Sequence, residues 1–475
     1  MSTVTETPNA GPSLLDLATE LLLIVFAHLE DEDLIRISLL STRLHHVALE
    51  LYLSRHGSYS ETSVSLVGPP FRMLPALRMA LFVQDLPLVS LTFLTDWVAQ
   101  GMLKGLERLI RRVSCVKKIE IHCGYGRSIM RQREHLEAME ALLVALAGKA
   151  CVELTMTGWY VRYPHDWTSK RPLSKKIRPV PCHDLPPLTS LNAFHIRHCN
   201  ISSPTLRTWT INSINLSPIT SLTLHSVTFS SHSPSSEILR LLALPLLSHL
   251  YIYSDRLIFS DVVIFLGRHP RVTNLSLAGG VAIISNSPFP AEALPILSVL
   301  KAPPHFVNHI LSSRGALPSL EAVVIDPDFP PMLHGEQSDL DQHFGGIEEC
   351  FVHLASREDV TTLRLILPPG SWAAHWLSEG SNLGQGERRS IGRSLVHITT
   401  LEVDVCGCSS FSPEMAPLFV RWLALFPALR YVTFDSFTFR QMSSNEQSAF
   451  ADSIGEACSS MEAVEIRYRK YVITH

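Results

Sequence analysis

Residues 191–196 read LNAFHI and residues 219–224 read ITSLTL, and both place apolar residues at the first, fourth and sixth positions. The last two apolar residues are two apart, so they point to the same face of a β-strand, while the residue between them points away. The pattern predicts a strand wherever it occurs. It also begins at Val116, Cys151, Leu247, Val272, Leu297, Leu320, Val360, Ile398, Leu429 and Met461.

Segments with helical spacing lie between these hexapeptides, for example residues 260–270 and 304–315. In the central part of the chain the hexapeptides begin at residues 191, 219, 247, 272, 297 and 320, so a new one starts every 23 to 28 residues. Strands joined by helical crossovers run parallel, and stacking of similar units buries the apolar edge of each. A doubly wound open sheet is the alternative, although such a sheet does not require a fixed period.

The strand pattern resembles the leucine-rich repeat, L-x-x-L-x-L-x-x-N/C-x-L, over about residues 116–475. Cys199 and Cys406 stand at the Asn/Cys position of two units. The resemblance implies an α/β fold, an irregular solenoid with parallel β-strands on its concave face and helices on its convex face.

A second apolar region precedes the repeats: residues 17–57 read LATELLLIVFAHLEDEDLIRISLLSTRLHHVALELYLSRHG. Three short helices are expected here. The first is apolar, the second begins at the acidic run 30–33, and the third runs from Ser41 or Thr42 to Gly57. A domain of about forty residues seldom buries enough surface to stand alone. Part of its apolar surface should therefore pack on the repeats or bind a partner.

This region resembles the F-box, whose pattern begins L-P-x-E-L-L-x-x-I-F-x-x-L. A proline usual in the family is replaced by Ala18. The matching residues are Leu17, Glu20, Leu21, Leu22, Phe26, Leu29, Asp33, Leu34, Arg43 and Ala48. The resemblance implies binding to a Skp-type adaptor and, through it, to a cullin-RING ubiquitin ligase. The adaptor contacts that it implies are Leu17, Leu21, Ile24, Phe26, Leu29 and Leu34.

These features divide the chain into a flexible tail (1–13), an F-box-like helical docking module (14–57), a connector and N-terminal solenoid cap (58–115) and the repeat region (116–475). Insertions in the repeat region are expected at residues 158–187, 326–345 and 368–394. The helical module has a second interpretation, since repeat proteins generally need a structural cap at their ends.

Candidate substrate-binding residues are the outward-facing side chains of the predicted strands. One group is aromatic and cationic, of the kind enriched at binding hot spots, and comprises His195, Arg197, His225, Tyr251 and Tyr253. A second group is acidic and would favour a basic partner; it comprises Glu402, Asp404, Asp435 and Glu465. A solvated strand face also needs polar residues, so a purely structural role stays open for each position.

The insertion at 158–187 interleaves basic and aromatic residues with prolines. It reads either as a solvated surface loop or as a segment that contacts phosphate or a partner. Cys406 and Cys408 lack a second pair at zinc-finger spacing, so they are expected to be buried thiols.

The composition and charge of the chain argue against several classes of function. The 475 residues are 46% hydrophobic and 18% charged, with a formal net charge of -4, which gives no general attraction to nucleic acid. The N-terminus does not read as a signal peptide, and the longest apolar run, residues 21–27, is too short to cross a membrane. A cytoplasmic or nuclear location, or both, is expected.

Phosphate-binding, zinc-protease and serine-hydrolase motifs are absent from the sequence, so neither catalysis, a metal nor a cofactor is expected. The sequence predicts the substrate-recognition subunit of an SCF-type cullin-RING ubiquitin ligase, which binds an unknown protein substrate through the repeats. The alternative is a leucine-rich-repeat scaffold or receptor without a ligase role, in which the N-terminal helices form a structural cap.

Overall fold

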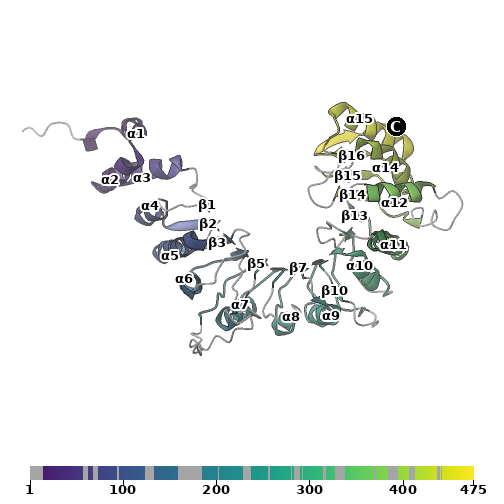
Figure 1. The fold of residues 1–475 in the computed structure, drawn as a ribbon, viewed down its shortest axis with the longest axis horizontal. Helices are drawn as coiled ribbons and strands as arrows, with labels where there is room; N and C mark the ends of the chain where they lie inside the picture. The colour runs from purple at the N-terminus through teal and green to yellow at the C-terminus, as the bar shows by residue number, and fades with distance from the viewer. Residues whose placement is uncertain are drawn as a thin grey trace, which may run out of the picture. The chain divides into compact units, whose positions relative to one another are not determined.

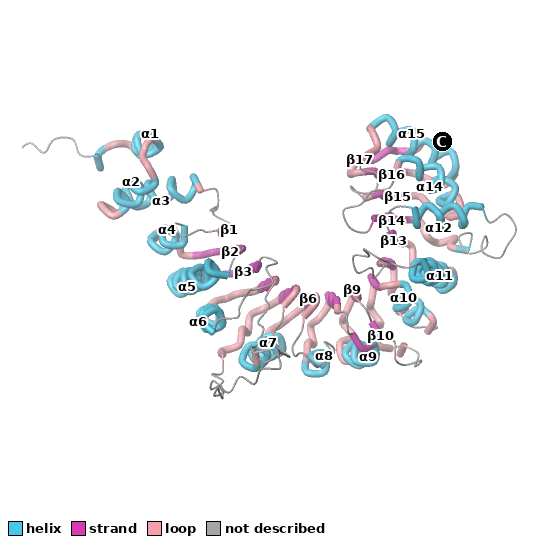
Figure 2. Tube along the Cα trace, viewed as in Figure 1, coloured by secondary structure: helices cyan, strands magenta, loops and turns pink. Residues whose placement is uncertain are grey.

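The computed structural model forms two compact units, one of residues 1–218 and 227–231 and the other of residues 219–226 and 232–475. Figures 1 and 2 show their strands and helices along the chain. The structure describes residues 14–56, 63–67, 73–93, 96–123, 133–158, 185–199, 201, 203–227, 237–254, 257–279, 281–282, 289–290, 292–313, 317–326, 337–367, 371–382, 394–405, 412–435, 439 and 441–474.

The first unit begins with short helices and continues with strands that alternate with helices. Its helices are η1 (Leu14–Asp16), α1 (Thr19–Ala27), α2 (Asp31–Ser38), α3 (Thr42–Arg55), α4 (Met73–Met79), α5 (Asp96–Arg112), α6 (Arg133–Ala147) and α7 (Pro204–Leu216). Its strands are β1 (Ser63–Val67), β2 (Asp85–Phe93), β3 (Cys115–Cys123), β4 (Glu153–Thr157) and β5 (Ala193–Arg197). Residues 14–56 are called the N-terminal helical domain below.

The five strands of the first unit are parallel and lie in chain order. Their register aligns one apolar side chain from each strand, all of them buried. This row is Val64, Val89, Ile119, Leu154 and Phe194. Helices such as α5 and α6 lie on one side of these strands (Figure 1). The face without a described helix is called the open face.

The second unit repeats the same alternation. Its helices are α8 (Glu237–Leu241), α9 (Phe259–Gly267), α10 (Pro304–Leu311), α11 (Gln337–Leu354), α12 (Ser371–Asn382), η3 (Pro413–Met415), α14 (Ala416–Leu423) and α15 (Ser444–Ala457). Its strands are β6 (Ser221–His225), β7 (His249–Tyr253), β8 (Leu257–Ile258), β9 (Asn274–Ala278), β10 (Val281–Ala282), β11 (Val299–Ala302), β12 (Ala322–Ile325), β13 (Thr362–Leu367), β14 (Thr400–Val405), β15 (Tyr431–Phe434), β16 (Ala463–Ile466) and β17 (Arg469–Val472).

The main sheet of the second unit is parallel from β6 to β16, and β8 pairs only with β10. Its central buried row is Leu222, Leu250, Leu275, Leu300, Val323, Leu363, Leu401, Val432 and Val464. At the end, β17 pairs antiparallel with β16. The turn between them places Arg467 and Tyr468 at φ 52° and 65°, in the left-handed region.

The predicted α/β fold is confirmed, because all twelve predicted hexapeptides form strands of these parallel sheets. The repeat pattern also extends into the predicted connector, where β1 and β2 pair with each other and β2 pairs with β3. The predicted insertions are partly regular, since α11 begins at Gln337 and α12 lies within 368–394. Residues 159–184 of the first predicted insertion lie outside the described residues.

The described α-helices range from five residues in α8 to 18 residues in α11. None of these helices combines the length and the apolar character that spanning a bilayer requires.

Candidate functional site

Helix α1 buries only a narrow stripe of its apolar surface. Leu22 and Phe26, four residues apart on one helical face, are 0% and 1% exposed. In contrast, Leu21, Leu23 and Ile24 are 49%, 40% and 59% exposed, and Val25 is exposed as well. The N-terminal helical domain therefore leaves most of the apolar side chains of α1 in contact with water.

The predicted adaptor contacts separate into surface and core residues. Leu21 and Ile24 are exposed, while Leu17 and Leu29 are half-buried. Phe26 and Leu34 are buried, and the prediction that they contact a partner directly disagrees with this burial. They instead form the core of the domain with the buried residues of α3, which are Leu44, His45, Val47, Ala48, Leu49, Tyr52 and Leu53.

The turn between α2 and α3 adds two apolar residues to this surface. Leu39 and Leu40 are 69% and 71% exposed. Helix α2 ends at Ser38, so Leu39 lies beyond its last residue. The Ser41 hydroxyl then accepts the Leu44 N–H at 3.3 Å and caps α3, as predicted.

The N-terminal helical domain is attached to the first repeat helix by two histidines of α3. The buried His45 accepts the Leu81 N–H at its Nε2 (3.3 Å), and its Nδ1 lies 3.0 Å from the Ser38 carbonyl. The His46 ring lies 5.2 Å from the Phe82 ring. This attachment uses α3 and the segment after α4, so it leaves the exposed side chains of α1 uncovered.

The open face of the first unit carries a network of charges. Lys118 on β3 lies 2.7 Å from Glu153 on β4 and 3.1 Å from Glu120. The predicted site residue His195 joins this network, with its Nε2 3.8 Å from Glu153. The other predicted residue of β5, Arg197, is exposed on the same face.

The charges of this network shift one another's pKa. The hydrogen bond to Glu153 raises the pKa of Lys118, outweighing burial, which acts in the opposite direction. Burial lowers the pKa of His195 below its ordinary value, and Glu153 opposes that shift only in part. The neutral imidazole of His195 is therefore favoured at neutral pH, and it can both donate and accept hydrogen bonds.

The structure brings three predicted aromatic residues together on the open face of the second unit. The ring of His225 on β6 stacks on Tyr253 of β7 at 4.4 Å between centroids and 21° between planes. Tyr251 lies 5.8 Å from His225 at 11°. The parallel register of β6 and β7 places these side chains next to one another. This cluster, called the aromatic cluster below, offers flat apolar surface and polar ring atoms.

A cation, Arg364, lies within the predicted acidic group and pairs with two of its four carboxylates, those of Glu402 and Asp404. Arg364 on β13 donates its Nε–H to Asp404 at 2.7 Å and lies 3.3 Å from Glu402. Burial would lower the pKa of Arg364, but Asp404, Glu402 and Asp435 together raise it. The register of β13 and β14 pairs Arg364 with Glu402, so the cation sits within the acidic group.

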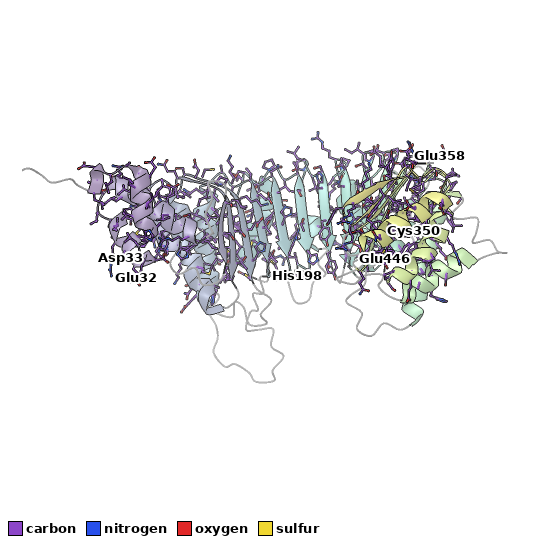
Figure 3. The ribbon with its side chains drawn as sticks, turned by 90° about the horizontal axis from the view of Figure 1, so that it is seen from above. Glu32, Asp33, His198, Cys350, Glu358 and Glu446 are labelled. Atoms are coloured by element: carbon purple, nitrogen blue, oxygen red, sulfur yellow. The ribbon has the colours of Figure 1, made fainter. Side chains whose placement is uncertain are left out.

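Other side chains give weaker evidence for a functional site. Within the described ranges no set of three His, Cys, Asp or Glu side chains is arranged to hold a metal ion. Burial raises the pKa of the Cys350 thiol on α11 well above its ordinary value, and burial lowers the pKa of His198 beyond β5 (Figure 3). Cys406 and Cys408 lie outside the described residues.

Comparison with known proteins identifies the N-terminal helical domain. The F-box domain model matches residues 14–56, which confirms the resemblance of the sequence to this family. The chain has no match among curated proteins.

Two solved structures are similar at low identity. One is the crystal structure of the Rad7 and Elc1 complex in yeast, which is 11% identical. The match covers 90% of this chain and 89% of the chain in that structure, with a TM-score of 0.40. The leucine-rich repeat-containing protein LegL7 from Legionella pneumophila is 17% identical, covers 60% of this chain and 77% of that chain, and has a TM-score of 0.32. Neither likeness is close enough to define the fold, which the strand register establishes. The chain therefore carries an F-box domain at residues 14–56, followed by leucine-rich-repeat-like strands and helices.

Proposed function

We propose that this chain is the substrate-receptor subunit of an SCF-type cullin-RING ubiquitin ligase. Its F-box domain binds a Skp-type adaptor, which connects it to the cullin, and its open strand faces bind a protein substrate. The observation that carries the proposal is the exposed apolar surface of α1 in a domain that matches the F-box. Ubiquitin transfer is performed by other subunits, and this chain contributes proximity between substrate and transfer site.

The exposed surface of α1 has the chemistry of an interface. Burying one leucine or isoleucine side chain contributes about 1.5–3 kcal/mol. Leu21 and Ile24 are three residues apart and so lie on neighbouring positions of one helical face. With Val25, four residues after Leu21, they form an apolar surface on one side of α1 that adaptor binding would remove from water.

The proposal is tested with the double variant Leu21→Asp, Ile24→Asp in the full chain. Binding of the purified protein to a Skp-type adaptor is measured by calorimetry or surface plasmon resonance. We expect the affinity to fall more than about 100-fold, because the variant loses two buried apolar contacts and places two carboxylates in an apolar interface. Both side chains are exposed in the free protein, so the variant should remain folded.

The alternative function, a scaffold without a ligase role, predicts a different result. The attachment of α3 to Leu81 and Phe82 is the observation that favours a structural cap. For such a cap, no adaptor binds the wild-type chain, and the double variant changes neither partner binding nor composition of captured complexes. Adaptor binding by the wild type that is unchanged in the double variant would also exclude the surface of α1 as the docking site.

We further propose that the aromatic cluster contributes to substrate binding. Its rings present flat surface on β6 and β7, and tyrosine is enriched at binding hot spots. The double variant Tyr251→Ala, Tyr253→Ala should still bind the adaptor. In affinity capture it should no longer bind the proteins that the wild type captures when degradation is blocked. A capture profile identical to that of the wild type would remove the cluster from the substrate site.

A further inference from the structure

Helix α1, the proposed docking helix, is held by little side-chain packing. Of its nine residues, only Leu22 and Phe26 are buried. The helix also lacks a side-chain cap at its first turn, since Ala18 occupies the N-cap position. Two buried side chains on one stripe leave the helix free to rotate or shift on its neighbours unless other contacts fix it.

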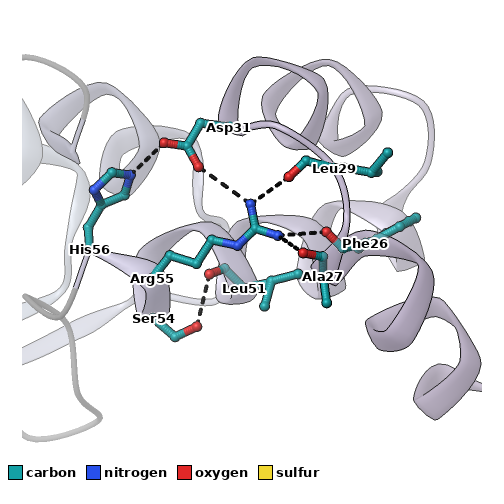
Figure 4. A network of polar contacts seen from close by, with 8 residues as sticks. All are labelled: Phe26, Ala27, Leu29, Asp31, Leu51, Ser54, Arg55 and His56. Carbon is teal, nitrogen blue, oxygen red and sulfur yellow. Dashed lines mark hydrogen bonds and ion pairs between the residues drawn. The ribbon is translucent and has the colours of Figure 1, made fainter.

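Arg55, in the last turn of α3, supplies such contacts at the end of α1. Its guanidinium donates to the carbonyls of Phe26 (2.8 Å), Ala27 (2.7 Å) and Leu29 (2.7 Å), as Figure 4 shows. The last carbonyls of a helix have no partner within the helix, and a cation there also interacts favourably with the helix dipole. One side chain thus holds the end of α1 and the loop that follows.

Asp31 orients this guanidinium from the other side. Its carboxylate lies 3.5 Å from Arg55 and 3.1 Å from the Nε2 of His56 (Figure 4). Asp31 is the first residue of α2, so the contact connects α2 to the same arginine. The planar fork of arginine can reach several acceptors at once, which the ammonium group of lysine does less well.

Arg43, near the beginning of α3, supplies contacts at the other end of α1. It donates to the Leu17 carbonyl at 2.6 Å, to the Thr19 hydroxyl at 3.3 Å and to the Leu15 carbonyl. These acceptors precede α1 or begin it. Arg43 and Arg55 are twelve residues apart, or about 18 Å along α3, so the two arginines hold both ends of α1.

The same device recurs where packing is deeper. Arg112 of α5 donates to the carbonyl of Leu77 in the last turn of α4 and to the carbonyls of Ala80 and Val83 just after it. In α4, however, Met73, Leu74, Ala76 and Leu77 are all buried. Packing therefore positions α4 together with its arginine, whereas α1 depends on its two arginines to a larger extent.

We propose that Arg43 and Arg55 are positioning residues that fix α1 so that its exposed apolar side chains fit the adaptor. The inference rests on the proposed function and names residues that act through α1. Neither guanidinium has to contact the adaptor. The two arginines set the position and rotation of the docking helix before binding, which lowers the ordering that binding would otherwise require.

The test uses the full chain with Arg43→Met, Arg55→Met and both together, because methionine keeps much of the aliphatic length but removes the donors. We expect each single change to weaken adaptor binding about tenfold, and the double change to weaken it further. Arg55→Lys should lose only about threefold, because it keeps the charge at the end of α1. Arg112→Met is the matched control, which should leave adaptor affinity within about twofold of wild type.

Hydrogen exchange of the free chain distinguishes positioning from general stabilisation. The methionine variants should speed exchange of the amides of α1 while those of α2 and α3 keep their protection. Equal loss of protection in all three helices would overturn the inference, as would adaptor affinity within twofold of wild type in the double variant. Failure of the wild-type chain to bind any Skp-type adaptor would instead contradict the proposed function, and exchange in α1 would still decide whether the arginines fix this helix.

Discussion

Helices α1 and α9 are each nine residues long and mostly apolar, but they treat their apolar side chains differently. In α9, Phe259, Val262, Phe265 and Leu266 are buried, and Ile264 is exposed. In α1 only Leu22 and Phe26 are buried. Composition alone therefore does not decide burial. The difference lies in what packs around each helix, since a repeat helix is covered by the strands beneath it and by neighbouring helices.

The comparison with α9 shows why the exposed apolar surface of α1 indicates a binding site. A single exposed isoleucine, such as Ile264, is ordinary on a protein surface. In α1, Leu21, Ile24 and Val25 are all exposed, and their spacing of three and four residues places them on one side of the helix, where they form a patch typical of a binding surface. Matched substitutions in α1 and α9 test this difference between the two helices.

Truncation of the buried aromatic residues should affect both helices alike. Phe26→Ala and Phe265→Ala should each destabilise their helix by about 3–5 kcal/mol, because each leaves a cavity in a packed core. Ile24→Ala and Ile264→Ala should each cost less than about 1 kcal/mol. Native-state hydrogen exchange measures the local unfolding free energy of each helix. A cost for Ile24→Ala close to that of Phe26→Ala would show that α1 is packed on both faces.

Helix α9 contains a buried carboxylate, which α1 lacks among its buried residues. Arg240 of α8 donates to Asp261 at 2.7 Å and 3.0 Å, and Asp261 is 2% exposed. Arg240→Met should destabilise α9 by about 2 kcal/mol, because it leaves a buried charge without its cation; the exposure of Arg240 keeps the effect below that of a fully buried pair. Urea unfolding measures the change. Adding Asp261→Asn should recover part of it, and no recovery would contradict this explanation.

The end of α9 should respond to pH through His269. This buried ring accepts the Leu244 N–H at 2.9 Å, and its Nδ1 lies 2.6 Å from the Phe265 carbonyl. Burial lowers the pKa of His269, with Arg268 acting in the same direction and the Phe265 hydrogen bond opposing it. Its contribution to stability is therefore complete above about pH 6.5 and falls as the pH drops below that value, because the unfolded chain takes up a proton more readily.

The expected slope is at most about 1.4 kcal/mol per pH unit. Thermal unfolding of wild type and His269→Gln between pH 7.5 and pH 5 measures it as a difference, because other histidines titrate in both proteins. Parallel curves would contradict the assignment to His269. The end of α1, in contrast, is held by the guanidinium of Arg55 and not by a histidine.

The smallest expected effect is that of Tyr468→Gly, which should change the stability of the second unit but not adaptor binding. Tyr468 has φ 65° in the turn between β16 and β17, a conformation that glycine adopts without strain. Tyr468→Gly should stabilise the second unit by about 1 kcal/mol, measured by thermal unfolding, and leave adaptor affinity unchanged. A destabilised variant would show that the exposed tyrosine makes a contact worth more than the strain.

Sequence periodicity predicted the repeat strands well, because one buried row of side chains recurs in each unit. It could have found β2 too, since Leu86, Val89 and Leu91 fit the same pattern. β1 was beyond its reach, because Glu61 stands three residues before Val64, where the pattern requires an apolar residue. A pattern that needs three apolar positions cannot recognise such a strand.

The candidate site was harder to predict for physical reasons. Residues 21–27 are all apolar, so periodicity cannot say which face of α1 is buried; the position of α3 decides that. The pairing of Arg364 with Asp404 depends on strand register across forty residues of sequence. The contacts of Arg43 and Arg55 with α1 could not be predicted either, because every residue has a main-chain carbonyl and the sequence does not show which carbonyls accept a side-chain hydrogen bond.

The central claim is that α1 leaves its apolar face open for an adaptor, whereas α9 does not. The most direct measurement compares Ile24→Asp with Ile264→Asp, since the two side chains have similar exposed fractions of 59% and 56%. The dissociation constant for a Skp-type adaptor should rise at least about tenfold for Ile24→Asp. It should stay within about twofold of wild type for Ile264→Asp. Equal affinities for the two variants would contradict the claim that α1 is the docking surface.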